Sequence, residues 1–192
     1  MGREFELKFR AIPEQIDAIR ARYGAFTPIS METTYYDTPG QNLRRLHWTL
    51  RRRMENGRSV CTLKTPLPDG SRGEWETEAD SIESAIPVLC NLGAPKQLLY
   101  LTAAGVEPFC GARFTRLAKL ISTDTVTIEL ALDQGILLGG GKELSFAEVE
   151  VEYKQGREAD AVTFAQTLAG EFHLVPEPKS KVARAMALTQ TI

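Results

Sequence analysis

Alternation of charged and apolar residues in several short segments is the strongest constraint on the fold of this chain. Residues 4–10 read EFELKFR, and residues 148–152 read EVEVE. Because successive side chains of a β-strand point to opposite faces, each segment would place its charges on one face and its apolar residues on the other. Residues 74–78 and 128–133 follow similar patterns. The period of two therefore predicts strands with one apolar and one strongly charged face.

Period-two segments occur throughout the chain and predict a mainly β protein with some helices. The eight expected strands cover residues 3–10, 31–37, 46–55, 58–65, 73–79, 112–121, 124–133 and 145–154. The expected helices cover residues 13–23, 81–92, 94–104, 157–172 and 179–188. Asn56-Gly57 predicts a tight hairpin, and the glycines at 139–141 predict a turn between strands. No Pro- or Ser-rich linker divides the chain, so we expect one domain over residues 1–192.

The overall composition argues against several classes of function. The 192 residues carry 23 basic and 25 acidic side chains, a net charge of -2, which gives no reason to expect nucleic acid or an anionic membrane as a partner. Cys61, Cys90 and Cys110 are odd in number and widely spaced, which argues against a disulfide framework or a Cys-rich zinc site. The N-terminal segment is charged and no long apolar run occurs, so we expect a cytoplasmic protein. The composition leaves the oligomeric state open.

The acidic faces carry charges of one sign, and this distinguishes them from an ordinary solvated sheet. For a single strand, exposure of the charged face to water is the simpler interpretation. The three glutamates at 148–152 repel each other, however, and adjacent strands normally alternate charges to relieve such repulsion. Same-sign rows on several strands indicate bound cations, because carboxylate oxygens are hard ligands suited to Mg²⁺, Mn²⁺ or Ca²⁺.

Basic side chains form a second set of rows on other segments. These rows comprise Arg51 and Arg53, then Lys64, then Arg116, and finally Lys181 and Arg184 near the C-terminus. Arg and Lys at several positions along the chain suit a polyanion with many phosphate oxygens, and Arg can form bidentate hydrogen bonds with them. Metal-binding carboxylates beside a basic cradle predict phosphoryl-transfer chemistry.

Closure of the sheet would reconcile these patterns with a stable fold. Eight antiparallel strands can close into a barrel, which removes the exposed edges of the sheet. The apolar faces would point outward beneath the helices, and the charged faces would line the lumen. Buried charge is costly unless it is paired or metal-bound, so such a lumen must stay hydrated and occupied. We therefore predict an eight-stranded closed antiparallel β-barrel with a polar lumen, surrounded by helices.

Several motifs resemble those of the CYTH superfamily, also called the triphosphate tunnel metalloenzymes. The ExExK pattern at residues 4–8 is similar to the signature of that superfamily. The resemblance continues in the family's order through YYDTP at 35–39, LRR at 43–45, LRRR at 50–53, TLK at 62–64, EWE at 74–76, IELALDQG at 128–135, EVEVE at 148–152 and SKVAR at 180–184. Thr49 stands where the family usually has Ala. The IELALDQG and EWE segments look most like those of bacterial inorganic triphosphatases.

The resemblance implies that carboxylates bind Mg²⁺ or Mn²⁺ in the tunnel and that basic side chains bind a triphosphate. The implied metal ligands are Glu4, Glu6, Glu148 and Glu150, with Glu4 and Glu6 facing the other two across the lumen. The implied phosphate contacts are Lys8, Arg51, Arg53, Lys64, Arg116, Lys181 and Arg184. The expected catalytic residues are Lys8, Glu76 and Glu152, one of the two glutamates accepting a proton from the attacking water. The roles of Tyr36, Asp37, Glu129 and Asp133 stay open.

The expected reaction is metal-dependent hydrolysis of the terminal phosphate of inorganic tripolyphosphate or a related triphosphate. A class IV adenylyl cyclase or a thiamine triphosphatase would use the same tunnel, and the sequence carries no specific mark of an adenine pocket. A non-catalytic polyphosphate- or nucleotide-binding module would be expected to have lost its metal carboxylates, which are intact here. A barrel with a solvated charged face is the blander alternative, and it would place those glutamates outward.

Overall fold

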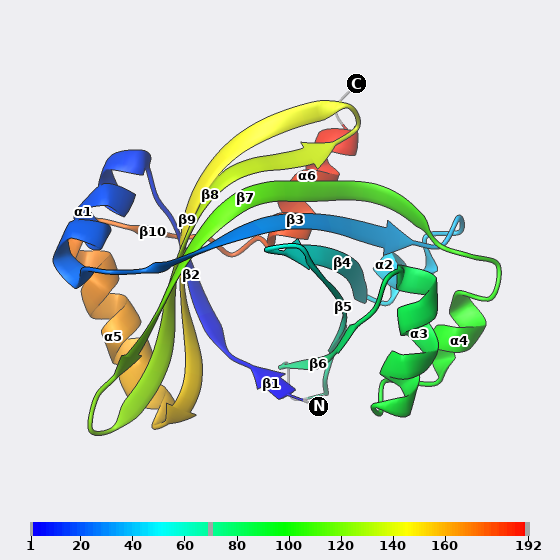
Figure 1. Ribbon diagram of the computed structural model, residues 1–192, viewed down its shortest axis with the longest axis horizontal. Helices are drawn as coiled ribbons and strands as arrows, with labels where there is room; N and C mark the ends of the chain where they lie inside the picture. Colours follow the sequence, from blue (N-terminus) through cyan, green and yellow to red (C-terminus); the bar gives the residue numbers. More distant parts are fainter. Residues whose placement is uncertain (1, 69–70, 191–192) are drawn as a thin grey trace.

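The structure, a computed structural model, describes residues 2–68 and 71–190, with the backbone alone for residues 2–4. Within these residues, ten strands form one sheet in which every pairing is antiparallel (Figure 1). The strands are β1 (Gly2–Glu4), β2 (Glu6–Arg10), β3 (Thr27–Asp37), β4 (Thr49–Glu55), β5 (Arg58–Pro66), β6 (Arg72–Glu78), β7 (Glu107–Ser122), β8 (Val126–Gly139), β9 (Lys142–Gly156) and β10 (Val175–Pro176). The helices are α1 (Pro13–Tyr23), α2 (Asn42–Arg45), α3 (Ile82–Asn91), α4 (Gln97–Leu101), α5 (Glu158–Glu171) and α6 (Lys181–Gln190).

The N-terminal segment borders both ends of the main run of strands, whose order is β1-β6-β5-β4-β3-β7-β8-β9-β2-β10. β1 pairs with β6, β2 pairs with β9, and Phe5 alone separates β1 from β2. The sequence predicted one continuous strand over residues 3–10. The structure divides it because the partner strand changes at Phe5, whose carbonyl oxygen accepts a hydrogen bond from the Tyr153 amide at 2.9 Å. One short stretch of chain thus meets two distant parts of a strongly curved sheet (Figure 1).

All eight predicted strands are present, and several are longer than predicted. β7, β8 and β9 have 16, 14 and 15 residues and form the long curved arms in Figure 1. The count reaches ten because the first strand is divided and β10 adds a two-residue strand after α5. The predicted hairpin turn is confirmed, since Asn56 and Gly57 both have positive φ, at 48° and 88°. Gly140 and Gly141, at 58° and 73°, make the turn between β8 and β9.

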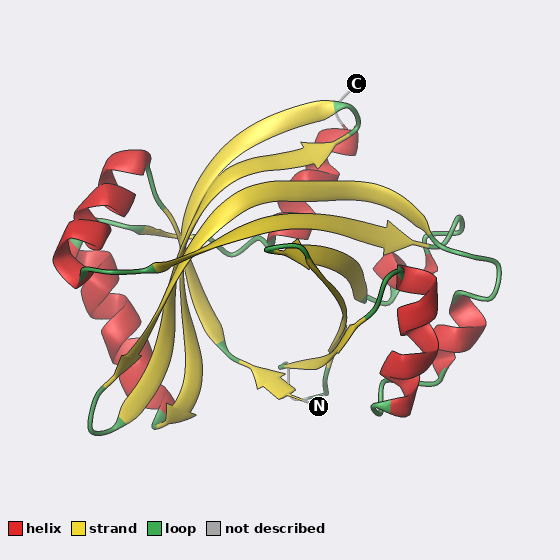
Figure 2. Ribbon diagram, in the orientation of Figure 1, coloured by secondary structure: helices red, strands yellow, loops and turns green. Residues whose placement is uncertain are grey.

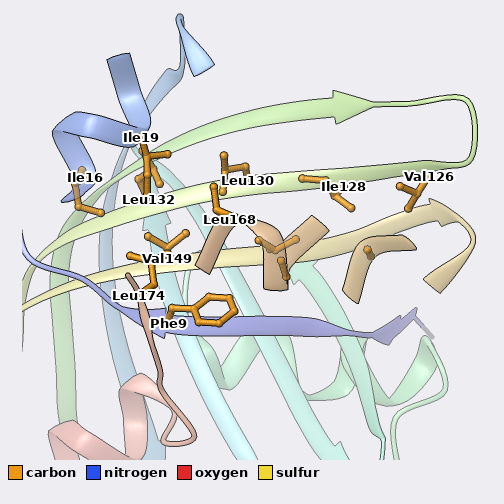
Figure 3. Packing of buried hydrophobic residues seen from close by; sticks show 13 residues of the cluster. Phe9, Ile16, Ile19, Val126, Ile128, Leu130, Leu132, Val149, Leu168 and Leu174 are labelled. Carbon is orange, nitrogen blue, oxygen red and sulfur yellow. The ribbon is translucent and has the colours of Figure 1, made fainter. Parts of the chain in front are cut away.

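Helices cover the apolar outer face of the sheet, as the alternation predicted (Figure 2). Beneath α1 and α5, one buried cluster includes Phe9, Ile16 and Val149 (Figure 3). Beneath α3 and α4, a second cluster includes Leu63 and Trp75. Each such side chain contributes about 1.5–3 kcal/mol through its removal from water. These two cores fix the outer faces of the strands and thereby direct the alternate, charged residues inward.

The last helix, α6, differs from the others because it packs against the concave face of the sheet. It contacts β7, β8 and β9. Its Val182 and Ala185 join a third cluster with Met31 and Phe114, and Phe114 shares its face of β7 with Arg116, two residues further on. The prediction that helices merely surround the sheet is therefore wrong for α6. Within the described part of the chain, no helix has the length and apolar character needed to cross a membrane.

Candidate functional site

A cavity of about 700 Å³ opens on the concave face of the sheet. Charged side chains from β2, β4, β5, β6, β7 and β9 and from the first turn of α6 dominate its lining. The predicted site residues that line it are Glu6, Lys8, Arg51, Arg53, Lys64, Glu76, Arg116, Glu150, Glu152 and Lys181. Glu148 and Arg184 lie just behind this surface, whereas the side chain of Glu4 falls outside the described part of the chain. The charged faces therefore point inward, which contradicts the alternative of a solvated outer face.

Three buried carboxylates form the one cluster among the described residues that could hold a metal ion: Asp133 of β8 with Glu148 and Glu150 of β9. One oxygen from each lies within 4.8 Å of the others. Strand pairing brings them together, because Asp133 lies opposite Glu148 and Glu150 follows two residues later on the same face. Asp133 and Glu148 are fully buried. The donor set fits Mg²⁺ or Mn²⁺, which prefer hard carboxylate oxygens.

Asp133 is the cluster residue to which the sequence analysis assigned no role. The alternation in segment 128–133 did indicate that Asp133 lies on the charged face of its strand, together with Glu129. The decisive information is the register of β8 on its neighbours, which places Asp133 between Arg116 and Glu148. That register is a tertiary property, so the motif alone could not distinguish Asp133 from Glu129.

Three basic side chains neutralise the cluster. Arg116 donates two hydrogen bonds to Asp133, from Nε to Oδ1 and from Nη2 to Oδ2, each 2.8 Å long, and also contacts Glu150. Lys181 Nζ lies 2.8 Å from Asp133 Oδ2 and 2.7 Å from Glu150 Oε1, and it also contacts Glu148. Arg184 contacts Glu148. These side chains, predicted as phosphate contacts, are thus paired with the carboxylates in this structure.

The pKa values of the cluster follow from burial and charge together. Burial raises the pKa of Glu148, and attraction to Lys181 offsets this only in part. Burial also opposes ionisation of Glu150, but Lys181 and Arg116 outweigh it and hold the pKa of Glu150 well below its usual value. Burial disfavours the charged forms of Lys181 and Arg116 as well, yet the surrounding carboxylates raise the pKa of both. The ionisation of each group in the cluster consequently depends on the charges of the others.

A basic wall faces the same cavity from β4 and β5. Arg51 Nη2 and Lys64 Nζ share the carboxylate of Glu74, at 3.9 and 3.4 Å. Arg53 donates a hydrogen bond from Nε to Thr33 Oγ1 at 3.0 Å, and its ion pair to the β4 carboxylate two residues on is long, at 3.7 Å. Burial and the like charge of Arg51 lower the pKa of Arg53 to about 10. Three cationic side chains on two neighbouring strands, Arg51, Arg53 and Lys64, suit an anion with several oxygens.

The first strand contributes Glu6 and Lys8 at the cavity, in an arrangement that corrects one expectation. β2 and β9 are neighbours, so Glu6 lies beside Glu152 and Lys8 lies beside Glu150. The prediction that Glu6 faces the carboxylates of β9 across the lumen is therefore wrong. Lys8 Nζ lies 3.8 Å from Glu6 Oε1 and donates a 3.5 Å hydrogen bond to the carbonyl of Lys179.

Asp37 organises a loop and does not line the cavity. Its Oδ1 accepts hydrogen bonds from the amides of Thr38 and Leu43, at 2.8 and 3.0 Å, and its Oδ2 accepts one from Arg44 Nε at 2.6 Å. Asp37 thereby fixes the entry to α2. Its neighbour Tyr36 packs against the outer cluster beneath α3 and α4. Both residues serve the architecture around the site.

The fold and the site together define a mainly antiparallel β protein with a cavity on the concave face of its sheet, lined by carboxylates interleaved with Arg and Lys. The CYTH domain family matches residues 2–186, and the chain belongs to this family.

Comparison with known proteins agrees with this assignment. An inorganic triphosphatase of Haemophilus influenzae is 31% identical over 196 residues, which cover 98% of this chain and 55% of the relative. The chain thus spans about half the length of that relative. A candidate adenylate cyclase from Bacillus halodurans has a similar structure, with a TM-score of 0.68 at 20% identity, covering 94% of this chain and 96% of the other. A Hippeastrum protein described as having a dominant triphosphatase activity gives a TM-score of 0.67 at 17% identity over 98% of this chain and 97% of its own. These two structures show the fold.

Proposed function

We propose that this chain hydrolyses the terminal phosphate of inorganic tripolyphosphate, or of a closely related triphosphate, with the help of Mg²⁺ or Mn²⁺. The observation that carries the proposal is one cavity in which a basic wall from β4 and β5 meets Glu150, with the other two carboxylates of its cluster, Asp133 and Glu148, buried just behind the cavity surface. The Haemophilus relative, an inorganic triphosphatase, supports the same chemistry.

The residues in and behind the cavity fall into two groups, one suited to bind a cation and one suited to bind phosphate. The three clustered carboxylates would hold a divalent ion, which when bound neutralises phosphate charge and lowers the pKa of a coordinated water. Arg51, Arg53 and Lys64 would bind the phosphate oxygens and stabilise the charge that spreads over them in the transition state. These roles require no covalent intermediate on the protein.

Glu76 is our preferred proton acceptor of the two glutamates predicted for that role. It lines the cavity, is exposed, and accepts a 3.2 Å hydrogen bond from Thr62 Oγ1, which orients its carboxylate. Glu152, by comparison, lies 2.8 Å from Lys154 and is engaged in that ion pair. A general base must have a lone pair within reach of the attacking water, and this favours Glu76.

We also infer that the curved sheet closes into a tunnel through residues 2–10. The pairing of β1 with β6 and of β2 with β9 supports this, because one continuous segment then joins the two ends. A closed tunnel would enclose the phosphates and strengthen each charge interaction by excluding bulk water. The cytoplasmic location, and the absence of nucleic-acid and membrane partners, stay predictions.

A substrate panel tests the proposed reaction. Phosphate release is measured from tripolyphosphate, thiamine triphosphate and ATP, with Mg²⁺, Mn²⁺, Ca²⁺ or a chelator, and ATP reactions are analysed for cyclic AMP. We expect tripolyphosphate turnover with Mg²⁺ or Mn²⁺, little with Ca²⁺, whose coordination is looser, and none with chelator. Cyclic AMP as the main product, or tight tripolyphosphate binding without turnover under all conditions, would replace the proposal with a cyclase or a binding module.

A pair of glutamate variants on β9 tests the assignment of residues. Glu150→Gln keeps the size of the side chain but removes its charge, and we expect phosphate release to fall on the order of 100-fold or more. Glu143→Gln is the matched control, because Glu143 lies on the same strand but is exposed and pairs with Arg113. Equal turnover by the two variants would remove Glu150 from the site.

A further inference from the structure

Lys181 occupies the place among the carboxylates that a metal ion would take. Its Nζ contacts all three members of the cluster, Asp133, Glu148 and Glu150, and the side chain is 7% exposed. It also lies 5.3 Å from the ring centre of Phe114. An ammonium in contact with three carboxylates is an internal counter-ion.

The charges of this cluster are already balanced without a further cation. The three carboxylates face three basic side chains, Arg116, Lys181 and Arg184. A divalent ion added to this set would leave two positive charges in excess inside a buried space, where charge interactions are weakly screened. Entry of a divalent ion therefore requires one of the basic side chains to leave.

Lys181 is the basic side chain that can leave most readily. Arg116 is held in a bidentate pair with Asp133, and Arg184 lies between Glu148 and Glu177, 3.8 Å from the latter. Lys181 instead carries a compact ammonium on a flexible stem, and its position overlaps that of a metal. The same oxygens that lie 2.7 and 2.8 Å from Nζ would bind Mg²⁺ at about 2.1 Å, so both cannot be bound there together.

We propose that Lys181 is a displaceable counter-ion of the carboxylate cluster, and that a divalent cation binds there by expelling its ammonium toward the cavity. The inference rests on the proposed function in one respect, namely that the cluster binds the metal. Lys181 then gains freedom to bind phosphate, since it already lines the cavity. Binding of the metal to the cluster and binding of phosphate by the Lys181 ammonium are then coupled, so that each favours the other.

Displacement of Lys181 also affects the helix that carries it. Lys181 is the first residue of α6, and Ser180 before it accepts a 3.2 Å hydrogen bond at Oγ from the Ala183 amide. The preceding segment is tied to β2 by the hydrogen bond from the Glu177 amide to the Lys8 carbonyl, 2.9 Å long. Loss of the Lys181 contacts would therefore loosen the first turn of α6 while the segment before it stays attached.

Metal binding without substrate tests the proposal directly. The probe is Mn²⁺, titrated into substrate-free protein and followed by calorimetry or by its electron paramagnetic resonance signal. We expect Lys181→Met to bind Mn²⁺ about tenfold more tightly than the wild type. Lys64→Met is the matched control, because it removes the same charge from the same cavity, at a lysine that lies 3.4 Å from Glu74 and outside the cluster. The control should change affinity by less than about threefold, as a distant charge does.

Hydrogen exchange of the wild-type protein gives a second readout that does not depend on a variant folding. With Mn²⁺ and no substrate, amides in the first turns of α6 should exchange faster, while those of α5 stay unchanged. The proposal is overturned if Lys181→Met binds Mn²⁺ no more tightly than Lys64→Met, or, where that variant fails to fold, if α6 exchange does not respond to Mn²⁺. Such a result, together with metal-dependent phosphate release, would leave the proposed function intact. Failure of the proposed function itself would appear as turnover that survives chelation.

Discussion

Individual side chains in the cavity are defined by their neighbours more than by their chemical type. Glu148 and Glu150 stand two residues apart on one strand face, yet their pKa values move in opposite directions. Burial dominates at Glu148 and raises its pKa. At Glu150, attraction to Lys181 and Arg116 outweighs burial and lowers the pKa. A row of identical residues can thus hold unequal charges, which a metal site and a proton-transfer site both require.

Acid sensitivity should depend on Glu150. Its folded-state pKa lies well below the ordinary value of 4.5, so its charge contributes stability above that pH, and the contribution is lost as the pH falls toward the folded value. Replacement by Gln should lower stability at pH 7 by about 1.5–3 kcal/mol, because Lys181 and Arg116 each lose one buried charged partner while they keep Asp133. Urea unfolding of Glu150→Gln between pH 3.5 and 7 should show a flatter pH dependence than the wild type. Parallel curves for the two proteins would contradict this.

Asp37 should prove structural when it is replaced. Asp37→Asn removes one acceptor and the charge that holds Arg44, so we expect a loss of about 1–3 kcal/mol in stability. Phosphate release per folded molecule should change little, because Asp37 does not line the cavity. Asp160→Asn, at a surface ion pair with Arg157, is the control and should leave stability close to that of the wild type. A large fall in kcat for Asp37→Asn at temperatures where it is folded would assign it a direct role instead.

The sequence predicted the inward direction of most site residues because alternation is a local property. Arg51, Arg53 and Lys64 line the cavity as their period of two indicates. The pairing of Asp133 with Arg116 and its position opposite Glu148 could not be predicted in this way, since both depend on the register of β8 with two other strands. Residue patterns thus indicate faces, and strand register decides partners.

Among the predicted helices, α6 lies on a face of the sheet that no sequence pattern indicated. Its helical period was clear, but helicity does not tell which face of a sheet a helix covers. Close approach on the concave side is possible because β8 ends in Gly139: a Cβ there would lie 2.2 Å from the carbonyl oxygen of Ala185. A glycine at a strand end is easily interpreted as part of a turn, and here it also makes room for a helix.

Gly139→Ala should therefore disturb α6 specifically. The added methyl group must push the helix backbone away, and such overpacking costs about 1–3 kcal/mol. We expect a lower unfolding temperature, faster hydrogen exchange in α6 and reduced phosphate release, since Lys181 and Arg184 move with the helix. Gly170→Ala in α5, where a Cβ meets nothing within 4 Å, is the control and should be neutral or slightly stabilising. Equal behaviour of the two variants would show that α6 adjusts without consequence.

At the scale of the whole molecule, the sheet depends on its N-terminal segment for both of its ends. β6 has β5 on one side and β1 on the other. Removal of residues 1–4 would leave one row of its backbone groups without a strand partner, and an unpaired edge exchanges its amides more readily. The outer core beneath α1 and α5 draws Leu7 and Phe9 from the next strand, β2.

We expect a chain lacking residues 1–4 to fold with lower stability and to lose hydrogen-exchange protection chiefly in β6. Amides of β8, which lies between β7 and β9, serve as the internal reference. Phosphate release should fall as well, because Glu74 and Glu76 of β6 line the cavity. Unchanged protection of β6 in the truncated chain would show that β1 contributes nothing to holding that strand in place.

The division of the N-terminal segment between β6 and β9 also sets an order of events during synthesis. Residues 6–10 find their partner strand only when residues 148–152 have been made, so this segment waits until the residues between them have been synthesised. Pairing over such a separation in sequence is slow, because loop-closure entropy is lost before the contacts form. On the ribosome, the strands β3 to β6 can assemble as consecutive hairpins well before that moment. The nascent protein consequently passes through a stage with its charged concave face open to water, and residues 148–152 must leave the ribosome before β2 can join its partner strand.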